Sequence, residues 1–203
     1  EDCTYKVLLV EAGGRDRNPW IHVPLGVGKL LTNEKYVWPF KSEPQVHLKG
    51  QQIYSPRGKV LGGSSAVNGM AYIWGDPAAF NAWQLDGWRW DDVLPYFRRL
   101  EDNPFSDDNR RGHAGPVKIT DLGKRDPDPL SEAFIDACKQ HGIIQTPDYN
   151  VDSYEGVRYL EQSAANGIRY STARAYLRDA EARSNLDILT NAPVTRIDIK
   201  NRR

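Results

Sequence analysis

The chain has 203 residues, 39% of them hydrophobic, which is enough for one large domain or parts of two. Its 27 basic and 27 acidic residues balance, which argues against a surface built for nucleic acid or for an anionic membrane. No apolar run is long enough to span a membrane, and Cys3 and Cys138 are too few for a disulfide framework or a metal site. We therefore expect a globular protein of the reducing cytoplasm that binds no metal.

The first predicted element is a buried parallel strand. An apolar, β-branched run from Tyr5 to Val10 ends in Glu-Ala-Gly-Gly, beginning at Glu11, and such a run is typical of a strand inside a parallel sheet. In a dinucleotide-binding domain the second strand ends in an acidic residue that binds the adenosine ribose, and a G-x-G-x-x-G turn lies about 20 residues earlier. Glu11 occupies that acidic position, although a surface acid at a strand end would look the same. No such turn precedes the strand, so we expect a truncated chain.

A long irregular region and a glycine-rich segment follow. Residues 15–56 show no sustained period, and an irregular segment of that length inside a compact domain is usually functional. In residues 57–72, RGKVLGGSSAVNGMAY, two adjacent glycines let the backbone approach a ligand, and two serines can cap a helix whose free N–H groups face it. Asn68 adds a neutral donor and acceptor. The segment suits a large, flat, phosphate-bearing cofactor, although Gly-Gly-Ser-Ser also occurs in plain flexible loops.

The remaining elements are predicted from caps, periodicity and turn residues. We expect a helix capped by Asp91 or Asp92 with Pro95 in its first turn, and a surface loop over residues 103–115. A strand is expected over residues 117–120. A helix capped by Asp128 is expected from Pro129 to His141, with Leu130, Phe134, Ala137 and Cys138 on one face. The last expected elements are a turn at Asn166-Gly167, a helix from Ser171 to about Glu181, and strands over Leu186–Thr190 and Val194–Lys200.

Several of these segments together carry a resemblance to a known family. The matching blocks, in order, are residues 7–14 (VLLVEAGG), 42–45 (SEPQ), 58–75 (GKVLGGSSAVNGMAYIWG), 87–97 (GWRWDDVLPYF), 171–177 (STARAYL) and 185–197 (NLDILTNAPVTRI). The chain resembles the N-terminal part of a glucose–methanol–choline (GMC) oxidoreductase of the choline-dehydrogenase-like branch, a family of FAD enzymes that oxidise alcohols. The resemblance extends from end to end of the chain.

The resemblance implies a fold and a division into domains. The fold class is α/β: a partial Rossmann-like FAD-binding domain plus part of a substrate-binding domain built on an antiparallel sheet. Residues 1–116 would be the FAD-binding domain without its first βα unit, residues 117–170 part of the substrate-binding domain, and residues 171–203 the return to the FAD-binding domain. Residues 15–56 would run over the FAD.

The resemblance also implies the cofactor contacts. The residues that would lie along a bound FAD are Glu11, Val60, Gly62, Gly63, Ser64, Asn68, Gly69, Met70, Ala71 and Val194. Ser64 could also act as a helix cap, which is compatible with this role. Some family members link the flavin covalently to a histidine at the position of Val67, and valine cannot form that bond. We therefore expect FAD to be held noncovalently.

No catalytic residue is assigned. The family's catalytic histidine lies near the C-terminus, and the four histidines, His22, His47, His113 and His141, match none of the family's catalytic positions. A lone histidine is more often a surface or packing residue.

We therefore expect an FAD-dependent enzyme that transfers a hydride from a small-molecule alcohol to flavin N5, with an electron acceptor that the resemblance does not specify. These 203 residues alone would be inactive. The alternatives are a hydroxynitrile-lyase-like FAD protein of the same fold and a non-catalytic flavin-binding fragment.

Overall fold

The computed structural model describes residues 4–106, 109–152 and 154–199. Cys3 and Lys200, on which two of the expectations above depend, lie outside the described residues. The chain forms two compact units, Glu1–Gly69 with Gly167–Arg203, and Met70–Asn166. The predicted division into FAD-binding and substrate-binding domains stays a prediction. Among the described residues, no helix combines the length and the apolar character needed to cross a membrane.

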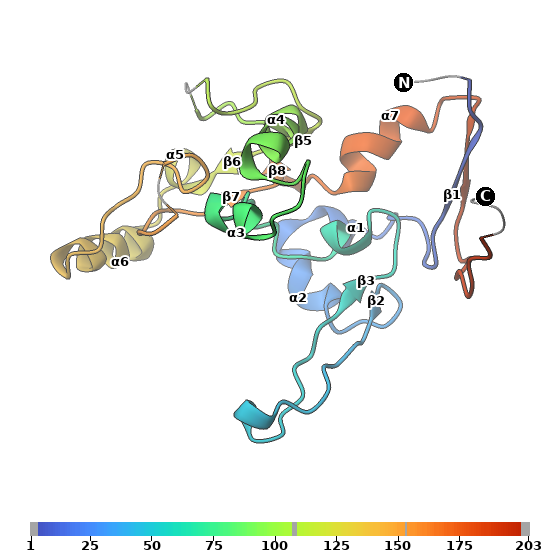
Figure 1. The fold of residues 1–203 in the computed structure, drawn as a ribbon, viewed down its shortest axis with the longest axis horizontal. Coiled ribbons are helices and arrows are strands. Elements are labelled where there is room, and N and C mark those ends of the chain that lie inside the picture. The colour runs from blue at the N-terminus through green and yellow to red at the C-terminus, as the bar shows by residue number, and fades with distance from the viewer. Residues whose placement is uncertain (1–3, 107–108, 153, 200–203) are drawn as a thin grey trace. The chain divides into compact units, whose positions relative to one another are not determined.

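The first unit contains short elements joined by long connections (Figure 1). Its strands are β1 (Val7–Val10), β2 (Val37–Trp38), β3 (Arg57–Gly58), β9 (Ile168–Arg169) and β10 (Leu186–Leu189). Its α-helices are α1 (Pro19–His22), α2 (Val27–Leu30) and α7 (Arg178–Ala180), and a π-helical turn spans Ala173–Leu177. Its 3-10 turns are Pro24–Gly26, Val46–Leu48 and Gly63–Ala66.

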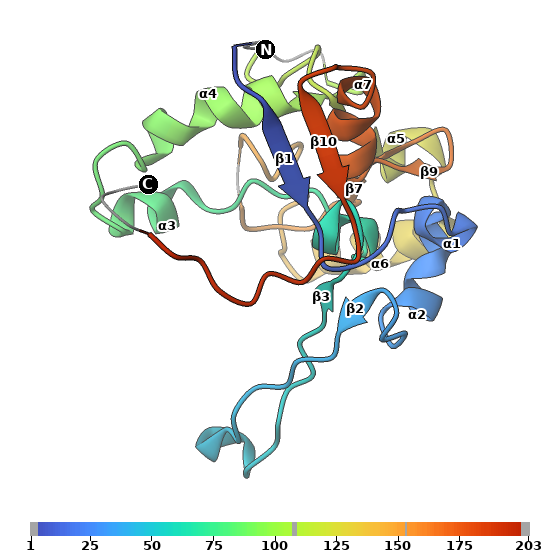
Figure 2. The ribbon, with the colours of Figure 1, turned by 90° about the vertical axis from the view of Figure 1, so that its right-hand side faces the viewer.

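Strands β1 and β10 form a parallel pair, with Val7 opposite Leu186 and Val10 opposite Leu189 (Figure 2). This confirms the parallel strand predicted within Tyr5–Val10 and the strand predicted over Leu186–Thr190. The expected burial is wrong, because Leu8 of β1 is 59% exposed. A parallel strand is buried only when helices or further strands cover both faces of its sheet, and this sheet has two strands among the described residues. The strand expected over Val194–Lys200 is also wrong for residues 194–199, which have no regular structure or pairing partner in the described chain.

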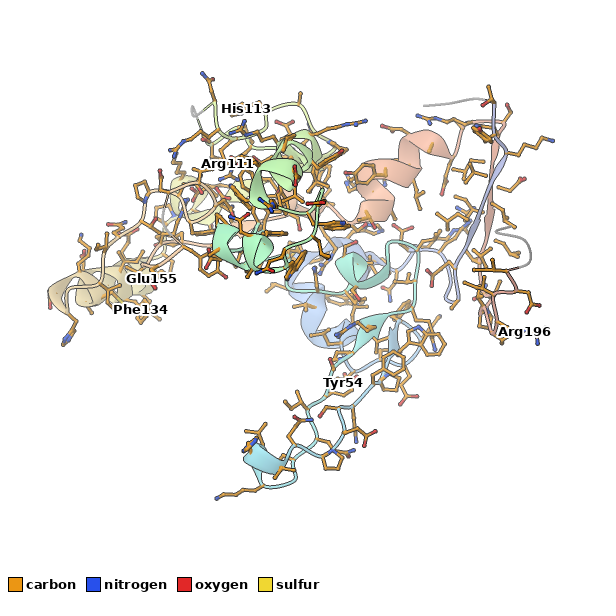
Figure 3. The ribbon with its side chains drawn as sticks, viewed as in Figure 1. Tyr54, Arg111, His113, Phe134, Glu155 and Arg196 are labelled. Atoms are coloured by element: carbon orange, nitrogen blue, oxygen red, sulfur yellow. The ribbon has the colours of Figure 1, made fainter. Side chains whose placement is uncertain are left out.

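The core of the first unit includes residues of the glycine-rich segment. Its buried hydrophobic side chains are Ile21, Leu30, Val37, Val60, Ala66 and Val67. Residues 15–56, expected to form an irregular loop, contain the helices α1 and α2. Each helix contributes one buried side chain to this core, Ile21 from α1 and Leu30 from α2. Between β2 and β3 the chain forms an extended arm, bridged at Lys41–Tyr54 and Gln45–Gln51, and the Tyr54 hydroxyl donates to the Leu31 carbonyl at 2.8 Å (Figures 1 and 3).

The second unit is richer in helix. Its helices are α3 (Pro77–Ala82), α4 (Trp90–Leu100), α5 (Leu122–Arg125) and α6 (Pro129–Gln140). Its strands are β4 (Glu101–Asp102), β5 (Val117–Lys118), β6 (Thr120–Asp121), β7 (Glu161–Gln162) and β8 (Ala164–Ala165). Strand β4 pairs with β5 in parallel, and β6 pairs with β7 antiparallel. The strand predicted over residues 117–120 is therefore present as β5 and β6.

The start of α4 corrects its predicted cap. The helix begins at Trp90, so Asp92 lies in the first turn, where its side chain accepts the Arg89 N–H at 3.1 Å. Neither Asp91 nor Asp92 is the capping residue, and Pro95 lies inside the helix rather than in its first turn. The cap pattern was misread because an acidic residue is favourable both at the cap and within the first turn.

Helix α6 has the predicted ends but a different buried side. Asp128 accepts the N–H groups of Leu130 and Ser131, and Gly142, with a φ of +80°, ends the helix. Of the predicted face, Leu130 is 78% exposed and Phe134 is also exposed, whereas Ile135 is buried. Periodicity identifies an apolar face but not whether another element covers it.

The last predicted helix begins where expected. The Ser171 hydroxyl oxygen accepts the Arg174 N–H at 3.3 Å, and the π-helical turn continues into α7. The predicted turn at Asn166-Gly167 is also confirmed, since both residues have positive φ, 52° and 73°.

Candidate functional site

Two glycine-rich segments of the first unit lie against each other. Gly14 forms a parallel bridge with Val60, and the Leu61 N–H donates to the Gly14 carbonyl at 3.0 Å. A Cβ at Gly13 would lie 1.8 Å from the Lys59 carbonyl oxygen, so only glycine allows this approach. The fold therefore brings the end of β1 and the glycine-rich segment together.

Glu11 turns back on its own loop. Its Oε1 accepts the Gly13 N–H at 2.7 Å, and the carboxylate is partly buried. The Glu11 carbonyl accepts the Ala192 N–H at 3.0 Å, and the Gly13 carbonyl accepts the Asn191 N–H at 2.7 Å. Residues 191–192, which precede Val194, thus run beside the end of β1. Val194 itself is exposed.

The Gly62–Gly63 turn leaves an open side. Both glycines have positive φ, 92° and 54°, which other residues rarely adopt. A Cβ at Gly62 would meet Ala173 at 3.2 Å, whereas a Cβ at Gly63 or Gly69 would meet nothing within 4 Å. The backbone at Gly63 and Gly69 is therefore accessible to a ligand.

The two serines do not cap the short helix, which corrects the prediction. The helical turn Gly63–Ala66 has no side-chain cap. The Ser64 hydroxyl oxygen instead accepts the Gly58 N–H at 3.0 Å, and the Ser65 hydroxyl donates to the Gly62 carbonyl at 2.6 Å. Both serines lie inside this turn, whose cap position is occupied by Gly62, so their hydroxyls bond to neighbouring backbone instead.

A basic cavity of about 620 Å³ adjoins the end of β1. Its lining includes Gly13, Gly14 and four cationic side chains, Arg15, Arg17, Lys35 and Lys59, and no carboxylate. One of these cations, Arg15, also pairs with Glu181 at 2.9 Å in an exposed position. A cavity with this charge favours an anionic ligand such as a phosphate-bearing cofactor.

The segment from Gly62 to Asn68 is held from one side by residues that the sequence did not predict as part of the site. Thr172 donates its N–H to the Ser65 hydroxyl oxygen at 2.9 Å and its hydroxyl to the Gly62 carbonyl at 3.2 Å. Arg169 donates to Asn68 through both the carbonyl oxygen, at 2.6 Å, and Oδ1, at 2.9 Å. The sequence signals near these residues are the Asn166-Gly167 turn before Arg169 and the matching block 171–177, which contains Thr172.

The other predicted contact residues occupy varied positions. Val60 is fully buried, whereas Ser64, Asn68 and Gly69 are exposed on the same segment. Met70 and Ala71 belong to the second unit, where the Met70 carbonyl accepts the Ser163 N–H at 2.9 Å and Ala71 bridges Gln162. Met70 has a φ of 63°, a strained conformation for a residue with a side chain. The role of every residue in the set as a cofactor contact stays a prediction.

A buried ion network in the second unit was missed by the sequence analysis. Arg111 and Glu101 have side chains that are 0% exposed, and they pair through Nε–Oε1 at 2.8 Å and Nη2–Oε2 at 2.9 Å. The same guanidinium contacts Glu161 at 2.8 Å and Asp148 at 2.5 Å. The loop expected at the surface over residues 103–115 is therefore partly buried. Its polar residues Asn103 and Arg111 are buried, and each has a side-chain hydrogen-bond partner there.

The pKa values of this network follow from its burial. Burial raises the pKa of Glu161, against the opposing effect of Arg111. Burial alone would lower the pKa of Arg111, but hydrogen bonds to Glu101 and Glu161 raise it above its ordinary value. The network is mostly buried, with only the Asp148 side chain partly exposed, and we interpret it as structural. The histidines also offer no reactive pair: His22 and His113 contact the carbonyls of Asp16 and Asn103, and His47 and His141 are exposed.

Comparison with known proteins identifies the family. Residues 7–203 match the GMC oxidoreductase family. The chain belongs to this family. The match covers nearly the whole chain and confirms the predicted resemblance and fold class.

The chain is also similar to individual proteins. It is 39% identical to the oxygen-dependent choline dehydrogenase of Vibrio vulnificus (strain YJ016), covering 100% of this chain and 37% of that protein. The crystal structure of pyridoxine 4-oxidase from Mesorbium loti superposes with a TM-score of 0.86 at 33% identity, covering 94% of this chain and 38% of that one. An FAD-dependent oxidoreductase from Chaetomium thermophilum gives a TM-score of 0.77 at 28% identity, covering 91% and 34%. The chain thus spans little more than a third of the length of these relatives.

Proposed function

We propose that this chain is the FAD-binding part of an FAD-dependent alcohol oxidoreductase of the choline-dehydrogenase-like branch. The observation that carries the proposal is the packing of Gly13-Gly14 against Lys59–Leu61 beside a basic cavity, in a chain of the GMC family. The similarity to a choline dehydrogenase supports an alcohol as substrate. The similarity to an FAD-dependent oxidoreductase supports FAD as cofactor.

The residues of the first unit fit such a group. Glu11 would bind the adenosine ribose, the basic side chains of the cavity would favour the phosphates, and the open backbone at Gly63 and Gly69 would admit the ring system. When bound, FAD supplies the oxidising chemistry, since its N5 accepts the hydride that leaves the alcohol carbon. The chain's own residues hold and orient the cofactor, and we assign no catalytic base to them.

A direct test uses the full-length protein that contains this chain. Under anaerobic conditions, choline or another alcohol that is a substrate should bleach the flavin absorption band, because the electrons remain on the cofactor. The measurement is a visible absorption spectrum before and after addition, with the matching carboxylate as control. Cleavage of a cyanohydrin without bleaching would favour the lyase instead, and a purified protein without flavin would contradict both.

The absence of a nucleophile at Val67 gives a second expected result. Val67 is buried in the core beside Ala66, so its side chain offers only methyl groups to any ligand. Precipitating the full-length protein with acid should release the yellow chromophore into the supernatant. Colour that stays with the protein pellet would contradict noncovalent binding.

A further inference from the structure

A second basic cavity lies in the first unit, between the loop after Gly14 and the helical segment that ends in α7. We call it the α7 cavity. Its volume is about 240 Å³, which is less than the roughly 300–1,000 Å³ typical of sites for drug-sized ligands. Its charged lining residues are four arginines and two acids: Arg15, Arg17, Arg174, Arg178, Asp16 and Glu181. The excess of arginines gives the cavity a positive charge.

The α7 cavity is distinct from the basic cavity beside β1. The two cavities share Arg15 and Arg17 and no other lining residue. The rest of the α7 cavity is lined by Leu61 and by residues 173–181, whereas the cavity beside β1 continues past Gly13 to Lys35 and Lys59. A ligand of the α7 cavity can therefore bind while a cofactor occupies the other cavity.

The guanidinium groups of the α7 cavity have donors to offer. Arg17 and Arg178 are exposed, and their side chains form no ion pair or hydrogen bond within the described part of the chain. Nε of Arg174 is buried and has no hydrogen-bond partner. Arg15 alone of the four pairs with a carboxylate, that of Glu181 at 2.9 Å. Like charges four residues apart on a helix, as at Arg174 and Arg178, are unfavourable unless an anion lies between them.

The chemistry of the lining selects the class of ligand. Arginine binds a phosphate group through two parallel N–H donors, and a phosphate monoester carries a charge between about −1.5 and −2 at neutral pH. That charge matches the excess of two arginines over the acids. Leu61 and Ala173, which are both buried, and Leu177 add an apolar part to the lining. A short hydrocarbon group attached to the phosphate would find apolar contacts there.

We propose that the α7 cavity is a binding site for the phosphate group of a small molecule, either a phosphate monoester or inorganic phosphate, and that it is occupied alongside the cofactor. Arg17 comes from the loop after β1 and Arg178 from α7, so a bound phosphate joins two segments that are far apart in the sequence. The ligand should therefore stabilise the first unit. The inference does not depend on the proposed alcohol oxidation.

The test is isothermal titration of the full-length protein, with its flavin bound, against inorganic phosphate and against propyl phosphate. Sodium chloride keeps the ionic strength constant, so that general screening does not change during the titration. We expect saturable one-to-one binding, a rise in the melting temperature with ligand concentration, and no release of flavin. Tighter binding of propyl phosphate would identify a monoester as the ligand, and equal binding would identify the phosphate group alone.

Two variants and one control test the assignment of the cavity. Arg178→Gln and Arg17→Gln should each weaken phosphate binding at least about tenfold, because each removes a charge-assisted donor. Both side chains are exposed, so neither change should prevent folding. Arg183→Gln is the matched control, since Arg183 is exposed near the end of the same helical segment but does not line the cavity, and it should change the affinity less than about twofold.

Three results would overturn the inference. They are the absence of saturable binding at constant ionic strength, an equal loss of affinity in Arg183→Gln and Arg178→Gln, and release of flavin by phosphate, which would make the α7 cavity part of the cofactor site. A full-length protein that is purified without flavin would contradict the proposed function instead, and the phosphate titration of that protein would still decide this inference.

Discussion

Replacing Arg111 by methionine is expected to unfold the second unit. The substitution leaves Glu101 without its guanidinium partner in a fully buried position, and it removes the partner that Glu161 and Asp148 share. Breaking a buried ion pair in this way typically lowers the free energy of unfolding by about 3–5 kcal/mol. Tryptophan fluorescence in urea reports the change, because Arg111 lies 4.9 Å from the Trp74 ring.

The neighbouring Arg110 provides a matched control. Its guanidinium pairs with Asp152 at 2.8 Å, but the Arg110 side chain is 48% exposed. Arg110→Met should therefore change the urea midpoint little, since exposed ion pairs contribute little to stability. Equal midpoints for Arg111→Met and Arg110→Met would contradict the structural role that we assign to the network.

Replacing Gly58 by alanine is expected to abolish tight FAD binding in the full-length protein. A Cβ at this position would lie 2.2 Å from the carbonyl carbon and oxygen of Gly63 and 2.5 Å from the Ser64 nitrogen. Because these atoms belong to backbone, the Gly62–Gly63 turn must move. A shift of that turn removes several cofactor contacts together, so we expect a loss of at least about a hundredfold in FAD affinity, measured by titrating the apoprotein with FAD.

Gly28→Ala is the control for this variant. Gly28 lies in α2, and a Cβ there meets nothing within 4 Å. Alanine is favoured over glycine inside a helix, so the protein should be unchanged or slightly more stable, and FAD affinity should not change. If Gly58→Ala bound FAD as tightly as Gly28→Ala does, the Gly62–Gly63 turn would not be part of the cofactor site.

The sequence predicted the elements whose signals are local. The apolar run Tyr5–Val10 and the glycines after it predict a parallel strand, and β1 is a parallel strand over Val7–Val10. The ends of α6 followed from Asp128 and Gly142, because caps and positive-φ glycines act within a few residues. The glycine-rich segment was recognised by composition, and the structure shows the close packing that requires glycine at Gly13 and Gly58.

The sequence could not predict features that depend on distant partners. Arg111 lies in a polar loop that is typical of a solvated surface, and its partners Glu101, Asp148 and Glu161 are spread along the second unit. Arg169 was missed for the same reason, since its acceptors lie 101 to 148 residues away. Burial of β1 and of the Leu130–Phe134 side of α6 was predicted wrongly, because periodicity does not reveal what covers an apolar face.

The pairing of β1 with β10 has a consequence for synthesis on the ribosome. Val7 lies opposite Leu186 in the strand pair. The β1–β10 ladder therefore cannot form until nearly the whole chain described here has been translated. At about 5–20 residues per second, roughly 10–35 s separate the synthesis of β1 from that of β10. Contacts of such large sequence separation also slow folding after release, because a long loop must close first. We therefore expect nascent chains of this protein to depend on chaperones that bind short apolar segments until β10 emerges.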